Sequence, residues 1–563
     1  MCRAAGERAM SGGIFAFLQG ETHALNKRLI VLTATSGIAN ALNLAVINAG
    51  VEALSRGGPP WQYFVWFGLS LGLFVYSLRY VLYASTRIAE SAICSVRIRL
   101  ADKIRRCDLL ALERIGEADI HARISRDTAA IAQAARPLFA AAQSAVMILF
   151  TMIYIATVSP VAVLLCLALI AGGASIYLKD RKGYEAGLES ASRQEDELFT
   201  TLNGLLKGFK EIRLNTRKSD DVFEDFSENA RRVRDVRTDV MLLFSDNYVF
   251  VEMFFVLLLG VIVFVVPILS ESFGSSVTKI VSAVLFFFGP LGNVVMMVPM
   301  LSQVNVTVEN LQRLEATLDA TLAKSNETPS APPVALAPFT TIRLDGVGFT
   351  YVDPDGKGTF TVGPINGEVR HGEILFLVGG NGSGKTTFLK LFTALYPPTV
   401  GAIRVDGQEI GPANIQSYRG LFSAIFSDFH LFDKLHGLHE IAPERVNAML
   451  RLMEISHKTA FADGRFTNTH LSTGQRKRLA LVVSYLEDKE VYIFDEVAAD
   501  QDPHFRHYFY ETLLPDLKAS GKTVVVVSHD DRYFHVADRV LRMDYGTLRD
   551  YVPNEIRGME APR

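Results

Sequence analysis

The chain has 563 residues, too many for one ordinary hydrophobic core, so we expect roughly two to four domains. Hydrophobic residues make up 49% of it and the mean hydropathy is +0.21, which is high for a soluble enzyme and comes from charge-free runs in the N-terminal half. The net charge of −3 gives no argument for a nucleic-acid partner, and the four cysteines lack metal-binding spacing, so we expect a reducing compartment or inert thiols.

The N-terminal half predicts a membrane domain of six helices over residues 29–305, preceded by a short cytoplasmic segment, residues 1–28. A helix needs about 20 mostly apolar residues to cross the hydrocarbon core, because each backbone polar group must be satisfied within the segment. Ser159-Pro160 divides the longest apolar run into a helical hairpin, so five runs supply six crossings. These runs are residues 29–51, 63–84, 137–178, 249–270 and 277–300.

The positions of lysine and arginine predict how these helices are oriented. Residues 86–136 contain ten of them and residues 179–247 contain thirteen, whereas the other connections hold almost none. We therefore expect both long connections, both chain termini and the C-terminal domain on the cytoplasmic side of the lipid bilayer. Apolar residues at near-helical spacing predict helices that extend beyond the bilayer toward a cytoplasmic motor; the alternative is that the charges serve only as a topology signal.

Several polar or helix-weakening residues within the spans are candidates to line a substrate cavity. The alternative is that asparagines join helices by hydrogen bonds and that glycine and proline relieve packing, with a kink expected in the last helix. The candidates are Asn40, Asn43, Asn48, Arg79, Glu252, Gly289, Pro290 and Gly292.

A linker and a second domain follow the membrane helices. Residues 306–340 turn polar and then proline-rich, which predicts the linker. Strand-like and helix-like stretches alternate over residues 341–563, which predicts an α/β domain. The expected strands are residues 341–344, 372–378, 491–494 and 523–528.

The run from Gly379 to Thr386 has the pattern G-x-x-x-x-G-K-T between a strand-like stretch and a helix-compatible one. Glycines allow the backbone to approach phosphates closely, and the start of a helix adds partial positive charge. We expect Lys385 to reach the β and γ phosphates of ATP and Thr386 to offer its hydroxyl to Mg²⁺. The alternative is a chance match to the pattern.

Two acidic residues and one histidine are candidates for the chemistry. Asp495 and Glu496 end an apolar strand, where the aspartate can hold Mg²⁺ through water and the glutamate can act as catalytic base toward the attacking water. His529 follows the strand-like residues 523–528 and can reach the γ phosphate or the water. The alternatives are an ordinary acidic strand end and a structural histidine.

Together with Leu471-Ser472-Thr473-Gly474-Gln475, these motifs resemble the phosphate loop, signature, magnesium strand and switch histidine of an ABC transporter nucleotide-binding domain. Six helices followed by one such domain are similar to the half-transporter layout of ABC exporters. The resemblance implies a membrane α-helical domain with six transmembrane helices plus a cytoplasmic α/β P-loop ATPase domain. It also implies an ATP-binding set: Tyr351, Gly379, Asn381, Gly382, Ser383, Gly384, Lys385, Thr386, Thr387, Ser472, Gly474, Gln475 and Asp502.

The chain departs from the family pattern at two places. Ser427 stands where the family usually has glutamine, so the magnesium and water contacts there pass to Asp428 or to the backbone. Residues 499–502 read Ala-Asp-Gln-Asp in place of Ser-Ala-Leu-Asp and keep the final aspartate. With the stretches around them, these departures are similar to the cyclic-peptide exporters, the group of pyoverdine-type siderophore and microcin efflux transporters.

This resemblance implies a homodimer, in which Ser472 and Gly474 of one chain contact ATP on the phosphate loop of the other. It implies ATP-driven export of a small peptide-derived substrate, cyclic, nonribosomal or modified, across the bacterial inner membrane, with no nucleic acid involved. Two alternatives stay open: a lipid or multidrug exporter of the same architecture, and an ATP-dependent membrane sensor.

Overall fold

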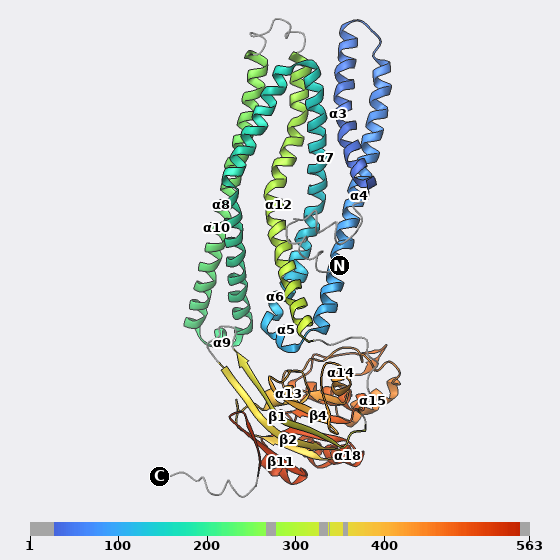
Figure 1. Cartoon of the computed structure of the whole chain (residues 1–563), viewed down its shortest axis with the longest axis vertical. Helices are drawn as coiled ribbons and strands as arrows, with labels where there is room; N and C mark the ends of the chain where they lie inside the picture. The colour runs from blue at the N-terminus through green and yellow to red at the C-terminus, as the bar shows by residue number, and fades with distance from the viewer. Residues whose placement is uncertain (1–26, 266–276, 326–335, 337, 353–358, 552–563) are drawn as a thin grey trace. The chain divides into compact units, whose positions relative to one another are not determined.

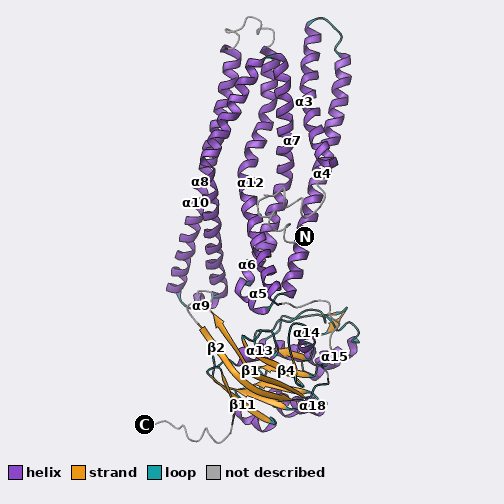
Figure 2. Cartoon of the chain, in the orientation of Figure 1, coloured by secondary structure: helices purple, strands orange, loops and turns teal. Residues whose placement is uncertain are grey.

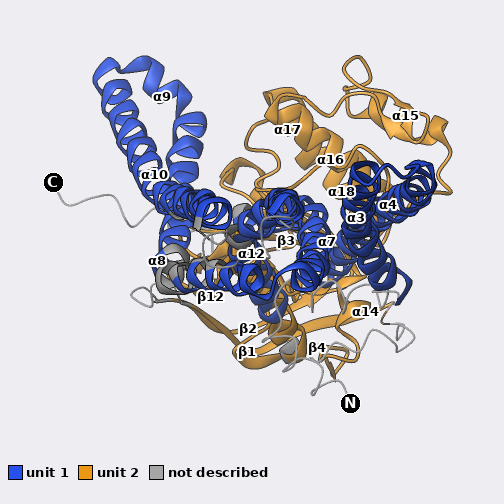
Figure 3. Ribbon diagram, turned by 90° about the horizontal axis from the view of Figure 1, so that it is seen from above, with its two compact units in different colours: residues 1–105, 117–317 blue, residues 106–116, 318–563 orange. Residues whose placement is uncertain are grey.

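The computed structural model describes residues 27–265, 277–325, 336, 338–352 and 359–551. They divide into two compact units (Figure 3). The helical unit comprises residues 1–105 and 117–317, and the motor unit comprises residues 106–116 and 318–563. Most of the predicted N-terminal segment, residues 1–26, lies outside the described residues.

The helical unit consists mainly of long helices (Figures 1 and 2). Its helices are α3 (Lys27–Ser55), α4 (Trp61–Arg106), α6 (Glu117–Ala122), α7 (Thr128–Val158), α8 (Pro160–Lys207), α9 (Phe209–Leu214), α10 (Thr216–Gly260) and α12 (Val277–Ser325), with single π-helical turns η1 (Arg123–Asp127) and η2 (Val261–Val265). Helices α8 and α10 pack side by side, as do α3 and α7.

Among the described residues, five helical segments are long and apolar enough to cross a membrane: Lys27–Ser55, Trp61–Arg106, Asp119–Val158, Thr216–Phe264 and Val277–Ala323. The sixth predicted crossing falls on α8, whose apolar part, Pro160–Gly172, is shorter. The predicted break of the hairpin is confirmed. Helix α7 ends at Val158, Ser159 accepts a hydrogen bond from the backbone of Ala162 at 3.3 Å, and Pro160 opens α8.

Helices α8 and α12 continue beyond the predicted spans. The sequence predicts the extension of α8 into residues 179–247 but not that of α12. Helix α8 runs as far as Lys207, and α12 runs without interruption as far as Ser325. Helix α12 therefore occupies the first part of residues 306–340, the range predicted as a linker. Gly289, Pro290 and Gly292 do not end this helix.

Most of the polar candidates of the first helix join helices to one another. Asn40 donates to the sulfur of Met147, and Asn48 donates to the hydroxyl of Tyr154 at 3.1 Å. Ser282 of α12 donates to the side-chain oxygen of Asn48 at 2.9 Å. The structure therefore favours the packing alternative for Asn40 and Asn48. Arg79 is exposed on the single chain and lies over the ring of Tyr83, so its place in a cavity stays a prediction.

The motor unit is built on two sheets. A six-stranded sheet has the order β12 (Thr547–Asp550), β11 (Arg539–Asp544), β3 (Ile374–Val378), β10 (Thr523–Val527), β9 (Val491–Asp495) and β6 (Phe422–Ile425), parallel except for β12. A four-stranded antiparallel sheet has the order β2 (Thr359–Arg370), β1 (Thr341–Val352), β4 (Val400–Val405) and β5 (Gln408–Glu409). The four predicted strands are confirmed as β1, β3, β9 and β10.

Every residue of β3, β9 and β10 is buried, as expected for parallel strands covered on both faces. Alternate residues face different cores: Ile374 and Phe376 pack in one, and Leu375 and Leu377 pack in the other. The first core includes residues of α15 (Pro443–Leu452), α16 (Thr473–Glu487), α17 (Pro503–Tyr508) and α18 (Leu514–Ala519); the second includes α13 (Lys385–Phe392), α14 (Ile415–Arg419) and the antiparallel sheet. The remaining elements are β7 (Phe461–Ala462), β8 (Arg465–Phe466), the π turn η4 (Phe509–Leu513) and the 3₁₀ helix η5 (Asp531–Val536).

One helix of the motor unit comes from the predicted cytoplasmic connection between membrane helices. Helix α5 (Leu109–Ile115) packs Leu109 and Leu110 against the second core. Its Glu113 accepts hydrogen bonds from Lys390 at 2.9 Å and from the hydroxyl of Tyr396 at 2.5 Å. The expectation that this connection meets the motor is thus confirmed at α5.

Candidate functional site

The phosphate loop joins the end of β3 to the start of α13. Three of its residues have positive φ angles, Gly379 at 152°, Gly382 at 76° and Gly384 at 106°. A Cβ at Gly379 would lie 2.3 Å from the carbonyl oxygen of Met543, so glycine is required there on steric grounds as well. Helix α13 begins at Lys385, so its N-terminal amides point toward the loop.

Two buried polar side chains of this loop are not paired with an acidic side chain or a hydrogen-bonding side chain among the described residues. The ammonium of Lys385, which is only 6% exposed, donates to the backbone carbonyls of Gly379 and Gly380 at 3.0 and 3.1 Å. The hydroxyl of Ser383 is buried without a hydrogen-bond partner among the described residues. Among the described residues, the buried ammonium of Lys385 donates to backbone carbonyls and the buried hydroxyl of Ser383 has no partner. Both observations fit a loop that receives phosphate oxygens.

Asp495 connects the phosphate loop to the strand that precedes the candidate base. The hydroxyl of Thr386 donates to its carboxylate at 3.2 Å. Burial raises the pKa of the Asp495 carboxyl, against the opposing hydrogen bonds from Thr386 and from the backbone amide of Ser427. Ser427 therefore reaches this carboxylate through its backbone, which is one of the two substitutes expected for the missing glutamine. A hydroxyl and a carboxylate are ligands that Mg²⁺ accepts.

Glu496 and His529 lie side by side at the ends of β9 and β10. The Nε2 atom of His529 is 3.2 Å from the Oε1 atom of Glu496, and both side chains are accessible to solvent. Glu496 has a positive φ angle of 54°, a conformation that non-glycine residues seldom adopt and that turns its side chain away from the strand direction. The carboxylate is thus placed beside an imidazole at the sheet edge that also carries the phosphate loop.

The signature segment begins helix α16. Ser472 is its N-cap: the hydroxyl accepts from the backbone amide of Gln475 at 3.4 Å, and the Gln475 side chain accepts from the backbone amide of Ser472 at 3.3 Å. Gln475 therefore caps its own helix. A Cβ at Gly474 would lie 2.7 Å from the carbonyl oxygen of Asp500, so the helix start packs directly on the loop after Glu496.

A network of charged and polar side chains links α16 to that loop, and sequence reasoning did not assign it. Lys477 donates to the backbone oxygen of Glu496 at 2.8 Å and to Asp500 at 2.6 Å. Arg478 donates to the side chain of Gln501 at 2.9 Å, and Gln501 donates to the carbonyl of Gly474 at 3.0 Å. The sequence signal for this network was the departure from the family pattern at residues 499–502. Two residues of that stretch, Asp500 and Gln501, bond to the signature helix.

Asp502 serves this framework as well. Its carboxylate caps α17 by accepting from the backbone of Phe505 at 3.0 Å, and it pairs with Arg478. The Phe505 amide, helped by the Arg478 guanidinium, lowers the pKa of the Asp502 carboxyl. A further open pocket of about 390 Å³ is lined by Thr473, Lys477, Glu496, Asp500 and Asp428, so acidic and basic groups of both segments face one space.

The remaining predicted residues of the ATP-binding set lie apart from this pocket. Tyr351 is 39% exposed near the end of β1, and Thr387 follows Thr386 in α13. The structure brings the phosphate loop, Asp495, Glu496 and His529 to one edge of the six-stranded sheet. Within the described part of the motor unit, no hydrogen bond joins the side chains of the phosphate loop to those of Ser472 or Gln475.

Comparison with known proteins identifies relatives along the whole chain. The family described as ABC transporter matches residues 362–499. The chain is 32% identical to "ATP-binding protein SyrD" of Pseudomonas syringae pv. syringae, with 99% of each chain covered. A solved structure, "Structure of a bacterial Atm1-family ABC exporter with ATP bound", has the same fold with a TM-score of 0.75 and 18% identity, covering 94% of this chain and 95% of that one.

Other relatives match over a shorter part of the chain. "ATP-dependent lipid A-core flippase" of Ralstonia nicotianae is 28% identical over 37% of each chain. "Subtilin transport ATP-binding protein SpaT" of Bacillus subtilis is 30% identical over 38% of this chain and 36% of its own.

Proposed function

Because this chain belongs to the ABC transporter family and is an ATP-driven exporter with a membrane-spanning helical unit, we propose that it exports a cyclic, nonribosomal or modified peptide across the bacterial inner membrane. ATP binding and hydrolysis reside in the motor unit. The helical unit carries the cargo path, with the motor and both termini in the cytoplasm, an orientation supported by the lysine and arginine content of residues 86–136 and 179–247.

The observation that carries the ATPase assignment is the cluster at one edge of the parallel sheet. Lys385 and the loop amides bind the phosphates. The buried hydroxyl of Ser383, which has no partner among the described residues, donates to a phosphate oxygen. Thr386 and Asp495 would hold Mg²⁺, which would neutralise phosphate charge when bound. Glu496 orients or deprotonates the attacking water, and His529 positions the Glu496 carboxylate.

The other members of the ATP-binding set complete the proposal. Gly379, Asn381, Gly382, Gly384 and Thr387 belong to the loop and the first turn of α13, Tyr351 stacks on adenine, and Ser472, Gly474 and Gln475 face the nucleotide of a second chain. Asp502 acts by holding α17 and Arg478, so its effect on ATP is indirect. The working assembly is a homodimer with two competent sites.

The cargo class rests on the motifs that resemble those of cyclic-peptide exporters. Two residues of these motifs, Asp500 and Gln501, belong to one network of hydrogen bonds with α16. Asp500 accepts from Lys477, and Gln501 accepts from Arg478. A relative whose name includes subtilin transport favours a peptide cargo. The lipid A-core flippase relatives favour the alternative of a lipid cargo, which the same helical unit permits because apolar cavities are easily altered.

Purified protein in proteoliposomes tests both parts of the proposal, the coupling of ATP hydrolysis to transport and the class of cargo. We expect Lys385→Ala to lower ATP hydrolysis about a hundredfold or more, and Glu496→Gln to retain ATP binding while hydrolysis and transport stop. The matched controls, Lys458→Ala and Glu444→Gln, change exposed residues of the same types and should leave hydrolysis unchanged. ATP-dependent uptake of fluorescent cyclic peptides is expected; uptake of lipid or dye without peptide would overturn the cargo class, and transport that persists in Glu496→Gln would overturn the coupling.

A further inference from the structure

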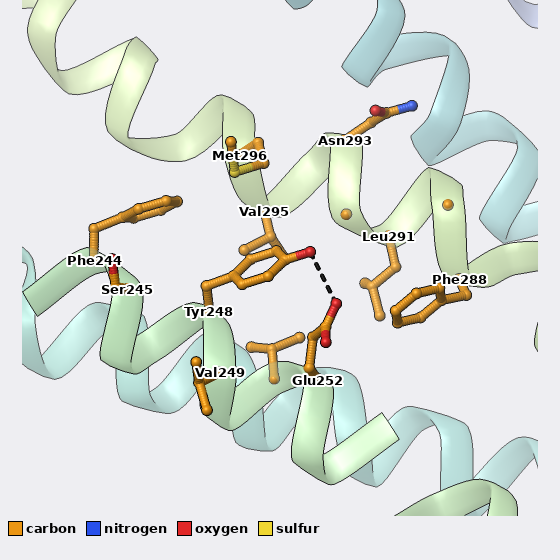
Figure 4. Close-up of a pocket in the computed structure, with 13 residues that line it drawn as sticks. Phe244, Ser245, Tyr248, Val249, Glu252, Phe288, Leu291, Asn293, Val295 and Met296 are labelled. Atoms are coloured by element: carbon orange, nitrogen blue, oxygen red, sulfur yellow. Dashed lines mark hydrogen bonds between the residues drawn. The ribbon is translucent and has the colours of Figure 1, made fainter. Parts of the chain in front are cut away.

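A cavity of about 650 Å³ lies in the helical unit between α10 and α12 (Figure 4). Its walls are mainly aromatic and aliphatic, with Phe244, Val249, Phe288 and Leu291 among them. Its size is within the range of cavities that hold small molecules. Glu252 lies in it, three residues after the start of the span predicted at residues 249–270, near the end that the sequence places on the cytoplasmic side.

Glu252 is the acidic residue among the described residues that line this cavity, and no lysine or arginine is among them. The hydroxyl of Tyr248, one helical turn earlier, donates to its Oε1 atom at 2.9 Å. Within the part of the chain that the structure describes, this is the one hydrogen bond or ion pair of the carboxylate. The Oε2 atom accepts no hydrogen bond from the described residues, and Asn293, which also lines the cavity, points away and donates to Ser144 of α7 at 3.2 Å.

Two other carboxylates on long helices of the helical unit are paired with cations. Glu52 of α3 pairs with Lys279 of α12 at 2.5 Å, and Glu315 pairs with Lys103 at 2.7 Å. A carboxylate in an apolar setting is unfavourable unless a counter-charge approaches it, and such residues face the interior of a bundle. Tyr248 supplies one hydrogen bond but no charge. Among the described residues of the helical unit, Glu252 therefore has no cationic partner of the kind that Glu52 and Glu315 have.

The opposite wall of the cavity is kept open by two glycines of α12. A Cβ added at Gly289 or at Gly292 would meet no heavy atom within 4 Å. Neither glycine is therefore required by close packing within the chain, and both lower the intrinsic stability of a helix by about 1 kcal/mol relative to alanine. Their absent side chains leave volume that a bound molecule can fill.

We propose that this cavity binds the ammonium or guanidinium group of the cargo, with Glu252 as the counter-charge and the aromatic and aliphatic walls taking the apolar body attached to it. Tyr248 positions the carboxylate by fixing one oxygen, which leaves the other for the cation. The ring of Tyr248 adds a second attraction for a positive charge. The inference rests on the proposed export function and narrows its cargo to molecules that carry a cationic group.

Binding of a matched probe pair to the full chain in phosphatidylcholine and phosphatidylglycerol nanodiscs tests this proposal. Dansylcadaverine carries a primary ammonium on an apolar fluorescent body, and its N-acetyl derivative has the same body without the charge. We expect the charged probe to bind about tenfold to a hundredfold more tightly, because a hydrogen bond to a charged group is worth that much. In Glu252→Gln, which keeps the acceptor for Tyr248, the preference should disappear.

Two further variants separate a binding role from a structural one. Glu197→Gln removes the same charge from an exposed position of α8 and should keep the preference. In Gly292→Leu the added Cβ would meet no heavy atom within 4 Å and the side chain would take up cavity volume, so the variant should weaken binding of both probes while the melting temperature stays the same or rises. Equal binding of both probes to the unaltered chain, or an undiminished preference in Glu252→Gln, would overturn the proposal.

Two further measurements ask whether a lipid or the cargo supplies the ammonium, and whether this inference can fail while the proposed export function holds. Adding phosphatidylethanolamine to the nanodiscs offers a lipid ammonium; if it displaces the probe, the site belongs to a lipid headgroup and the cargo proposal is wrong. Binding is measured without ATP. A chain that hydrolyses ATP and exports peptide but shows no charge preference would retain the proposed function and lose only this inference, whereas loss of hydrolysis alone would leave the cation site intact.

Discussion

The buried carboxyl of Asp495, a proposed Mg²⁺ ligand, opposes folding when it is ionised. It is 2% exposed and ends a strand whose every residue is buried. Burial raises its pKa, although Thr386 and the Ser427 amide donate to it. A group whose folded pKa is raised binds its proton more tightly in the native state, so its ionisation at neutral pH opposes folding. A bound cation would relieve that cost.

The pH dependence of stability should reveal this residue in a difference measurement. As pH falls from 7 toward the ordinary aspartate value of about 3.9, the unaltered chain regains stability at Asp495 while Asp495→Asn does not. We therefore expect the melting temperature of the unaltered chain to rise relative to that of the variant as the solution is acidified, without nucleotide. A constant difference between the two would contradict the raised pKa. The variant should also lose ATP hydrolysis about a hundredfold.

Single residues were predicted from the sequence when their role depends on a local pattern. The phosphate loop, Asp495, Glu496 and His529 each follow a strand within a few residues, and the sheet brings them to one edge. The capping role of Gln475 is also local, because Ser472 and Gln475 stand three residues apart. The contacts of Arg478 with Gln501 and Asp502 depend instead on how α16 packs on the loop after β9. Nothing in the spacing of those residues predicts these contacts.

At the scale of elements, α5 connects a membrane-helix loop to the motor through one carboxylate. Glu113 accepts from both Lys390 and Tyr396, and Tyr396 stacks on Phe349 of β1 with ring centroids 4.9 Å apart. Burial alone would lower the pKa of Lys390, but its hydrogen bonds to Glu113 and Tyr396 outweigh burial and raise it. The contact therefore joins α5, α13 and β1 through charge as well as through the packing of Leu109 and Leu110.

Glu113→Gln should weaken this connection without touching the ATP-binding loop. We expect a loss of about 1 kcal/mol in the stability of the motor unit, since the carboxylate is partly exposed and its ion pair is screened. Basal ATP hydrolysis should persist, while its stimulation by cargo falls. The exposed Glu90 of α4 offers a matched control as Glu90→Gln. Unchanged cargo stimulation in Glu113→Gln would show that α5 transmits nothing through this pair.

Most elements were predictable because their periodicity and apolar content are local properties. The membrane helices had to satisfy their own backbone groups, and the buried strands β3, β9 and β10 are continuous apolar runs. The assignment of α5 to the motor unit was not predictable in its residues, because it depends on tertiary contacts of Leu109 and Leu110. The weakening or kink expected at Gly289 and Pro290 stays a prediction, and α12 continues through both residues.

At the scale of the whole molecule, one chain carries a phosphate loop and a signature segment with no hydrogen bond between their side chains in the described motor unit. The Ser472 hydroxyl is used for capping, and the N-terminal amides of α16 remain available to an anion. The proposed homodimer places each signature on the nucleotide of the partner. A chain with a defective phosphate loop and a chain with a defective signature should therefore form one intact ATP site together. A site within one chain could not be restored in this way.

Mixed dimers of Lys385→Ala chains and Ser472→Asp chains test the shared site. Aspartate retains the N-cap of α16 but places a negative charge toward the phosphates, so the helix should still form. Each variant alone should lack ATP hydrolysis. In the mixed dimer one site collects both lesions, whereas the other combines an intact loop with an intact signature, so part of the activity should return. If each chain bound ATP with its own signature, both sites would stay defective and mixing would restore nothing.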